Sequence, residues 1–154
     1  MGGHHDKGDQ SARVGVGARQ MKLTLPTDSE ERKNVPMFTG CLAYAPAALA
    51  GVARHSKAGN DKHNPGEPMH HARGKSNDHA DCILRHVMDL ADMIAALDRP
   101  PLGTDGRAEQ RAVIEALLAE ANALSWRALM WSQELHETFG GAPLAPGARA
   151  APPR

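Results

Sequence analysis

Apolar and polar residues alternate along this chain with the spacing of helices over three stretches. The first is the Ala-rich run CLAYAPAALAGVARHSKA at residues 41–58, with Pro46 suited to a first turn and Gly59 placed as a C-terminal stop. The second follows a cap at Ser76 or Asn77, and the third runs from about 107 to 138. Their expected inner faces comprise Leu49, Val52, Ala53 and Ser56; then Ile83, Leu84, Val87, Met88, Leu90, Ala91, Ile94 and Leu97; and then Val113, Ile114, Leu117, Ala121, Leu124, Ala128, Trp131 and Leu135. The pattern predicts an all-α helical bundle.

The segment between the first two predicted helices is polar and rich in turn-forming residues. It contains Gly59, Pro65, Gly66, Pro68 and Gly74, so we expect an irregular loop. The side chains that this loop presents are Asn60, Lys62, His63, Asn64, His70, His71, Arg73 and Lys75. Their amides and imidazoles are suited to hydrogen bonds with the edge of a nucleotide base. A second break, DRPPLGTDG at 98–106, predicts the connection between the second and third helices.

Four aspartates and one arginine form a narrow stripe on the polar side of the second predicted helix, namely Asp78, Asp81, Arg85, Asp89 and Asp92. A solvated face is the usual interpretation of such a stripe. Aspartate is, however, a poor residue in a helix interior, and DxxD spacing lets two carboxylates hold one cation. Glu120 borders the inner face of the third helix and falls level with residues 81–85 in an antiparallel pair. We therefore expect Asp78, Asp81 and Glu120 to bind Mg²⁺ or Mn²⁺ rather than zinc.

The composition limits the class of protein. The 154 residues fit one domain, which we place at 21–139 between a flexible tail at 1–20 and a tail at 140–154 that is disordered or weakly docked. Eighteen basic residues balance eighteen acidic ones and aromatic residues are few, which argues against direct nucleic-acid binding. The two cysteines are isolated, as in a reduced protein without a zinc ribbon. No apolar run approaches the ~20 residues of a membrane span, so we expect a cytoplasmic protein.

Carboxylates that hold a divalent cation commonly serve to bind polyphosphates, and this suggests a reaction. We expect Asn60, Lys62, His63, Asn64, His71 and Ser76 to bind a nucleotide. Arg85 and Lys75 would neutralise phosphate oxygens, and Asp81 would orient a water for attack on phosphorus. The residues alone therefore favour metal-assisted hydrolysis of a nucleoside polyphosphate.

Three segments carry a further signal: RKNVPMFTG (32–40), YAPAALAGVARHSKAGNDKHNPGEPMHHARGKSNDHADCILRH (44–86) and SWRALMWSQELHE (125–137). They cover about half of the chain and resemble the phage family of MazG-like dATP/dGTP diphosphohydrolases, including its MazZ type, which is associated with 2-aminoadenine DNA synthesis. The resemblance implies an all-α MazG-like pyrophosphohydrolase that forms a dimer or tetramer to complete its bundle. It implies release of pyrophosphate from a purine (d)NTP, most often dGTP or GTP, in the cytoplasm of the host cell. The resulting dGMP would supply 2-aminoadenine nucleotide synthesis.

Several alternatives stay open from the sequence. The MazG superfamily carries ExxE and ExxD pairs on successive helices, whereas the first long helix here has no acid between residues 41 and 58. An HD-type phosphohydrolase needs a contiguous His-Asp pair, and the one in this sequence is His5-Asp6. A non-enzymatic helical adaptor would use the acidic stripe to bind a basic partner. The roles of Asp89, Asp92 and His86 are likewise open, and for Trp126 an oligomer interface is favoured over base stacking.

Overall fold

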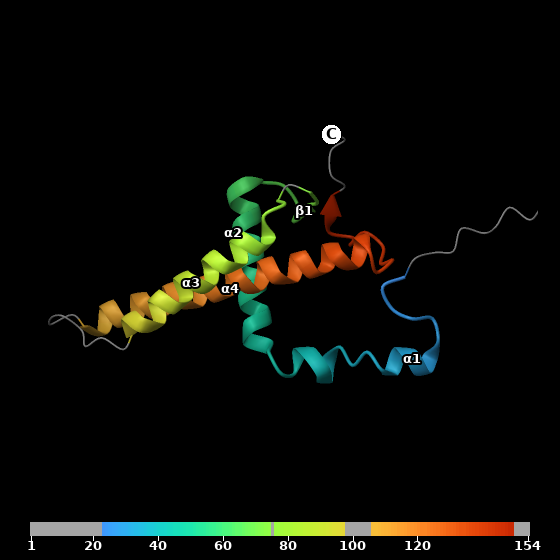
Figure 1. Ribbon diagram of the computed structural model, residues 1–154, viewed down its shortest axis with the longest axis horizontal. Coiled ribbons are helices and arrows are strands. Elements are labelled where there is room, and N and C mark those ends of the chain that lie inside the picture. The colour runs from blue at the N-terminus through green and yellow to red at the C-terminus, as the bar shows by residue number, and fades with distance from the viewer. Residues whose placement is uncertain (1–22, 75, 98–105, 150–154) are drawn as a thin grey trace, which may run out of the picture.

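The computed structural model describes residues 23–74, 76–97 and 106–149, which form a mostly helical molecule with a very small sheet (Figure 1). Its helices are α1 (Ser29–Lys33), α2 (Pro46–His63), α3 (His79–Leu97) and α4 (Gly106–Thr138), with a π-helical turn at Phe38–Leu42. The strands β1 (His71–Ala72) and β2 (Ala148–Arg149) contain two residues each. α3 and α4 lie side by side and antiparallel, and α2 crosses them steeply. The predicted helical class is confirmed at this coarse level.

The end of α2 corrects one prediction from the sequence. Gly59 lies inside the helix, which continues to His63, so residues 60–63 form its last turn and do not belong to the loop. A single glycine costs a helix only about 1 kcal/mol, whereas a proline sterically keeps the residue before it out of the helical conformation. Asn64, which precedes Pro65, accordingly ends α2 with φ −137° and ψ 62°.

α2 and α4 approach each other closely where they cross. A Cβ atom on Gly51 would lie 2.2 Å from Oδ1 of Asn122, so a larger residue at this position would displace the asparagine side chain. Val52 and Ala123 are the buried apolar residues of the described chain, with exposures of 8% and 9%. Ala53, which we predicted on the inner face of this helix, is exposed.

Much of the predicted apolar face of α3 lies on the surface. His79 and His86 contact glutamates of α4, and this fixes the side of α3 that faces its neighbour. The large apolar side chains exposed on the two helices are Leu84, Val87, Met88, Ile94, Ile114, Leu118, Leu129, Trp131 and Leu135. The apolar pattern of α3 therefore describes a face that α4 covers only in part.

The segment that follows α4 is held against the rest of the fold up to residue 149. β2 pairs in parallel with β1, with His71 opposite Ala148 and Ala72 opposite Arg149. This arrangement differs from the disorder that its Pro, Ala and Gly content suggested. The backbone N–H of Ala145 also donates to the Glu137 carboxylate at 3.0 Å, a contact that composition does not reveal.

Two predictions concern segments outside the described residues: the tail at 1–20 and the connection at 98–106, apart from Gly106. Among the helices that the structure describes, none is by itself long and apolar enough to cross a bilayer. Ser29–Leu42 and Pro46–His63 meet the criteria of length and composition only as a pair bent by 86°.

Candidate functional site

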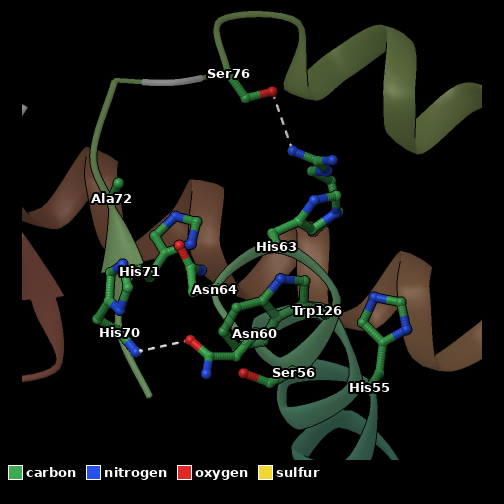
Figure 2. A pocket seen from close by; sticks show the side chains of 12 residues that line it. His55, Ser56, Asn60, His63, Asn64, His70, His71, Ala72, Ser76 and Trp126 are labelled. Atoms are coloured by element: carbon green, nitrogen blue, oxygen red, sulfur yellow. Dashed lines mark hydrogen bonds between the residues drawn. The ribbon is translucent and has the colours of Figure 1, made fainter. Parts of the chain in front are cut away.

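A cavity of about 500 Å³ lies between the end of α2, the β1 segment and the middle of α4 (Figure 2). α2 contributes His55, Ser56, Asn60 and His63 to its lining, the following segment contributes Asn64, His70, His71 and Ser76, and α4 contributes Trp126 and Arg127. Figure 2 shows these side chains arranged around one space, with the imidazoles on several sides. The cavity therefore gathers amides, imidazoles, hydroxyls and one guanidinium from three parts of the chain.

Asn60 connects the last turn of α2 to the loop beyond it. Its Nδ2 donates to the carbonyl of Glu67 at 3.2 Å, and its Oδ1 accepts from the backbone N–H of His70 at 3.4 Å. The residue is only 6% exposed, so these hydrogen bonds satisfy a side chain that would otherwise be costly to bury. Gly66, with φ +80°, lies in the turn that this side chain closes. Asn60 therefore shapes the cavity wall as well as lining it.

Arg127 is the cation of the cavity lining, and sequence reasoning did not select it as a site residue. Its Nη1 donates to Oγ of Ser76 at 3.1 Å, a neutral acceptor that leaves the positive charge uncompensated at this contact. Ser76 in turn donates to Oδ1 of Asp78 at 2.6 Å. The signal available in the sequence was the position of Arg127 at the border of the inner face of its helix, from which a side chain reaches a neighbouring element.

Two imidazoles of the cavity have lowered pKa values. Burial lowers the pKa of His55 below its ordinary 6.5, and the charges of His86 and Arg127 lower it further against the effect of Glu120. Burial and then the Arg73 cation lower the pKa of His71, against its hydrogen bond with Glu134. Both shifts favour the neutral imidazole, in which one ring nitrogen is a donor and the other an acceptor.

A buried polar network lies beside the cavity on its α4 side, and the sequence reasoning missed it. Arg73 makes two hydrogen bonds of 2.7 Å to the Glu137 carboxylate, and the Nε2 atom of His79 lies 3.1 Å from Glu134. His79 also stacks on Trp131 with ring centroids 6.0 Å apart. The only sequence signal was that Glu134 borders the inner face of its helix, because these pairs join residues far apart along the chain.

A second cluster offers ligands for a metal ion. His86, Asp89 and Glu120 each present one ligand atom, and the three atoms lie within 4.8 Å of one another. His86 Nδ1 forms a hydrogen bond with Glu120 across the α3–α4 contact. Glu120 thus reaches the neighbouring helix as predicted. His55 lines the cavity, and the charges of His86 (lowering) and Glu120 (raising) act on its pKa.

Asp78 and Asp81, the other predicted metal ligands, lie outside this cluster. Asp78 is bound by Arg85 Nη2 at 3.1 Å as well as by Ser76. The Ser76 hydroxyl and then the Arg85 guanidinium hold the pKa of the Asp78 carboxyl far below its usual range. Asp81 is exposed on α3. The structure therefore brings Glu120 together with His86 and Asp89, and the predicted ligand set stays a prediction.

The remaining predicted site residues divide between the cavity and the surface. Five of the nucleotide ligands line the cavity, namely Asn60, His63, Asn64, His71 and Ser76. Lys62 lies on the exposed side of the last turn of α2 and does not belong to the described lining. Arg85 is exposed and paired with Asp78, and Lys75 lies outside the described residues.

Comparisons of the chain with protein-family models, with curated proteins and with solved structures found no match.

Proposed function

We propose that this protein is a metal-dependent nucleoside triphosphate diphosphohydrolase that converts a purine (d)NTP, preferably dGTP or GTP, to the monophosphate and pyrophosphate. The observation that carries the proposal is the cavity, in which five predicted nucleotide ligands lie together with Arg127. Its volume of about 500 Å³ falls within the range of small-molecule sites. The resemblance to MazG-like diphosphohydrolases supports the same chemistry.

The lining of the cavity suits a polyphosphate and a base at once. Arg127 supplies a positive charge for phosphate oxygens. The Ser76 hydroxyl, which accepts from Arg127 and donates to Asp78, holds this guanidinium in place. The Asn64 amide and the neutral His71 imidazole supply donors and acceptors for the edge of a purine. Arg85 and Lys75 are the further cations that the sequence predicts to neutralise phosphate oxygens.

The donor set beside the cavity fits the cation that this reaction requires. Two carboxylates and one imidazole, from Asp89, Glu120 and His86, suit Mn²⁺ and are acceptable to Mg²⁺. When bound, such an ion supplies charge neutralisation and activation of water. We propose that Glu120 is a ligand in either candidate set, with His86 and Asp89 as its nearest companions.

The proposed step is a hydrolysis at the α-phosphorus. The oxygen of a water forms a bond to this phosphorus, the bond from phosphorus to the bridging oxygen breaks, and pyrophosphate leaves. Asp81 is the residue predicted from the sequence to orient this water, and the proton that the water loses passes to solvent. The site residues bind and orient the nucleotide so that the water lies in line with the leaving oxygen.

The proposed oligomeric state and cellular role rest on the exposed apolar residues and on the resemblance to the MazG-like family. The exposed apolar faces of α3 and α4 support a homo-oligomer, as a dimer or tetramer. In a phage-infected cell the product dGMP would supply 2-aminoadenine nucleotide synthesis in the cytoplasm, without direct contact to nucleic acid or membrane.

The proposal is tested by a product assay of the full chain with each of the eight common nucleoside triphosphates in the presence of Mg²⁺ or Mn²⁺. We expect pyrophosphate and a purine monophosphate. Release of intact triphosphate would instead indicate HD-type chemistry. If calorimetry detects binding of neither Mn²⁺ nor a non-hydrolysable dGTP analogue, the adaptor is the correct alternative.

A matched pair of variants links the activity to this cavity. Arg127→Gln removes the cation of the lining, and we expect KM to rise about tenfold or more because a charge-assisted hydrogen bond is lost. Arg107→Gln removes an exposed cation from the same helix and serves as the control. Equal KM values in the two variants would place the nucleotide elsewhere.

A further inference from the structure

The loop that carries His70 and His71 is attached to the fold on two sides. On the α2 side, Asn60 holds the backbone of Glu67 and His70. On the other side, the N–H of His71 donates to Gly147 O at 2.9 Å, and the N–H of Arg73 donates to Arg149 O at 3.1 Å. The C-terminal segment at 142–149 therefore supplies the hydrogen-bonding partners of the loop backbone next to the cavity.

One carboxylate connects this C-terminal segment, the loop and α4. Glu137 accepts two hydrogen bonds of 2.7 Å from Arg73, one of 2.9 Å from Gln133 and one of 3.0 Å from the N–H of Ala145. The side chains of Arg73 and Glu137 are each only 10% exposed. A buried bidentate pair has a fixed geometry, which a solvated ion pair lacks.

The position of His71 depends on these attachments. Its ring meets Trp126 edge-on with centroids 5.8 Å apart, and its Nε2 lies 3.5 Å from Glu134. His71 and Trp126 line both the main cavity and a smaller one of about 280 Å³, and Ala145, Gly147 and Ala148 also line the smaller one. Removal of the C-terminal segment would remove these lining residues and the carbonyl of Gly147 that accepts from the His71 N–H.

We propose that Glu137 is a positioning residue: through Arg73 and Ala145 it fixes the C-terminal segment on the loop, and so holds His71 in the wall of the nucleotide cavity. This inference rests on the proposed function for its effect on the substrate. The clamp itself, formed by Glu137, Arg73 and the segment 142–149, is a property of the fold and can be measured without substrate. Glu137 does not line the cavity described above and acts through its neighbours.

Four variants distinguish an effect on the clamp from an effect on α4, the helix that carries Glu137. Glu137→Gln removes the charge, and Glu137→Asp keeps the charge on a shorter side chain. Ala145→Pro removes the N–H that donates to Glu137 and leaves the Glu137 carboxylate in place, at a site already followed by Pro146. Glu115→Gln changes an exposed glutamate of α4 and serves as the control.

Amide hydrogen exchange of the full chain is followed by NMR without nucleotide. We expect exchange at His71 and Arg73 to accelerate about tenfold or more in Glu137→Gln and in Ala145→Pro. Amides in the middle of α4 should accelerate only as far as the free energy of global unfolding falls in the same variant, and circular dichroism should stay unchanged. Glu137→Asp should restore part of the protection. Unchanged exchange in Ala145→Pro together with Glu137→Gln would overturn the clamp.

Steady-state kinetics on the purine triphosphate identified by the product assay test the effect on substrate. In Glu137→Gln and Ala145→Pro we expect KM to rise about fivefold or more while kcat changes by less than about twofold, because the clamp positions His71, which binds the substrate. Faster exchange with an unchanged KM would overturn the positioning role while the proposed function stands. Absence of turnover in the unmodified protein would refute the proposed function, and with it the kinetic effect, while the exchange data still report on the clamp.

Discussion

At the scale of single residues, Glu120 is the carboxylate on which the two candidate metal sets overlap. It was predicted with Asp78 and Asp81, and it lies with His86 and Asp89. We expect Glu120→Gln and Asp89→Asn each to weaken Mn²⁺ binding about 10-fold or more, because loss of even an outer-shell partner typically lowers metal affinity by about 10- to 100-fold. Calorimetric titration of Mn²⁺ into each folded variant measures the effect directly.

Asp81→Asn distinguishes the two sets, because Asp81 belongs only to the predicted one. If Mn²⁺ affinity and turnover are lost in Asp81→Asn and kept in Asp89→Asn, the ligands are Asp78, Asp81 and Glu120, reached through a rearrangement or a second copy of the chain. Circular dichroism of each variant confirms that its helical content is intact.

The sequence identified cavity residues where their chemistry is concentrated in one short segment. His63, Asn64 and His71 lie within nine positions, so their spacing alone indicated a shared site. The sequence did not identify residues whose role depends on a partner that is distant along the chain. Glu137 meets Arg73 across 64 residues, and this pairing depends on the register of α4 against the loop, which no local pattern specifies.

At the scale of elements, the sequence indicated the start of α2 but not its end. Pro46 begins the helix, as a proline suited to a first turn indicated, whereas Gly59 was wrongly taken for a stop and the helix continues until the residue before Pro65 ends it. Beyond α4, composition suggested disorder, but β2 is fixed by the hydrogen bonds of Glu137 and β1. The low hydrophobicity of this segment suggested disorder because hydrophobicity does not report on attachment through buried polar contacts.

The attachment of the C-terminal segment predicts a specific pH dependence. The Arg73 guanidinium lowers the pKa of Glu137 from 4.5 to about 2. A lowered pKa in the folded state stabilises the fold above pH 4.5, and this stabilisation is lost as the pH falls from 4.5 towards 2. We expect Glu137→Gln to be about 3 kcal/mol less stable than the unmodified protein at pH 7, because the buried Arg73 guanidinium then has only Glu134, at 3.9 Å, as a counter-charge among the described residues.

Urea unfolding at pH 7, 5 and 3 measures this difference. The difference between the unmodified protein and Glu137→Gln should be similar at pH 7 and 5 and smaller at pH 3. Glu115→Gln should follow the unmodified protein throughout. A constant difference across the series would show that Glu137 keeps an ordinary pKa and that its contacts with Arg73 are weak.

At the scale of the whole molecule, the helical class was predictable because the helical period of apolar residues was clear. Packing within one chain, however, covers only part of the apolar helix faces. On α3, Leu84, Val87 and Ile94 are 60%, 46% and 53% exposed, although the pattern places them on an inner face. The pattern therefore describes an inner surface larger than the one that α2 and α4 cover. A second copy of the chain would supply the missing surface.

The predicted oligomer can be tested on this surface. We expect the unmodified protein to be a dimer or tetramer by size-exclusion chromatography with light scattering, and Leu84→Glu or Val87→Glu to shift it towards the monomer, because burial of a charge costs several kcal/mol. Arg54→Glu changes an exposed, polar position of α2 and should leave the assembly intact. If turnover falls together with the oligomer, a neighbouring copy completes the site, whereas a monomeric unmodified protein with full turnover would show that one chain is sufficient.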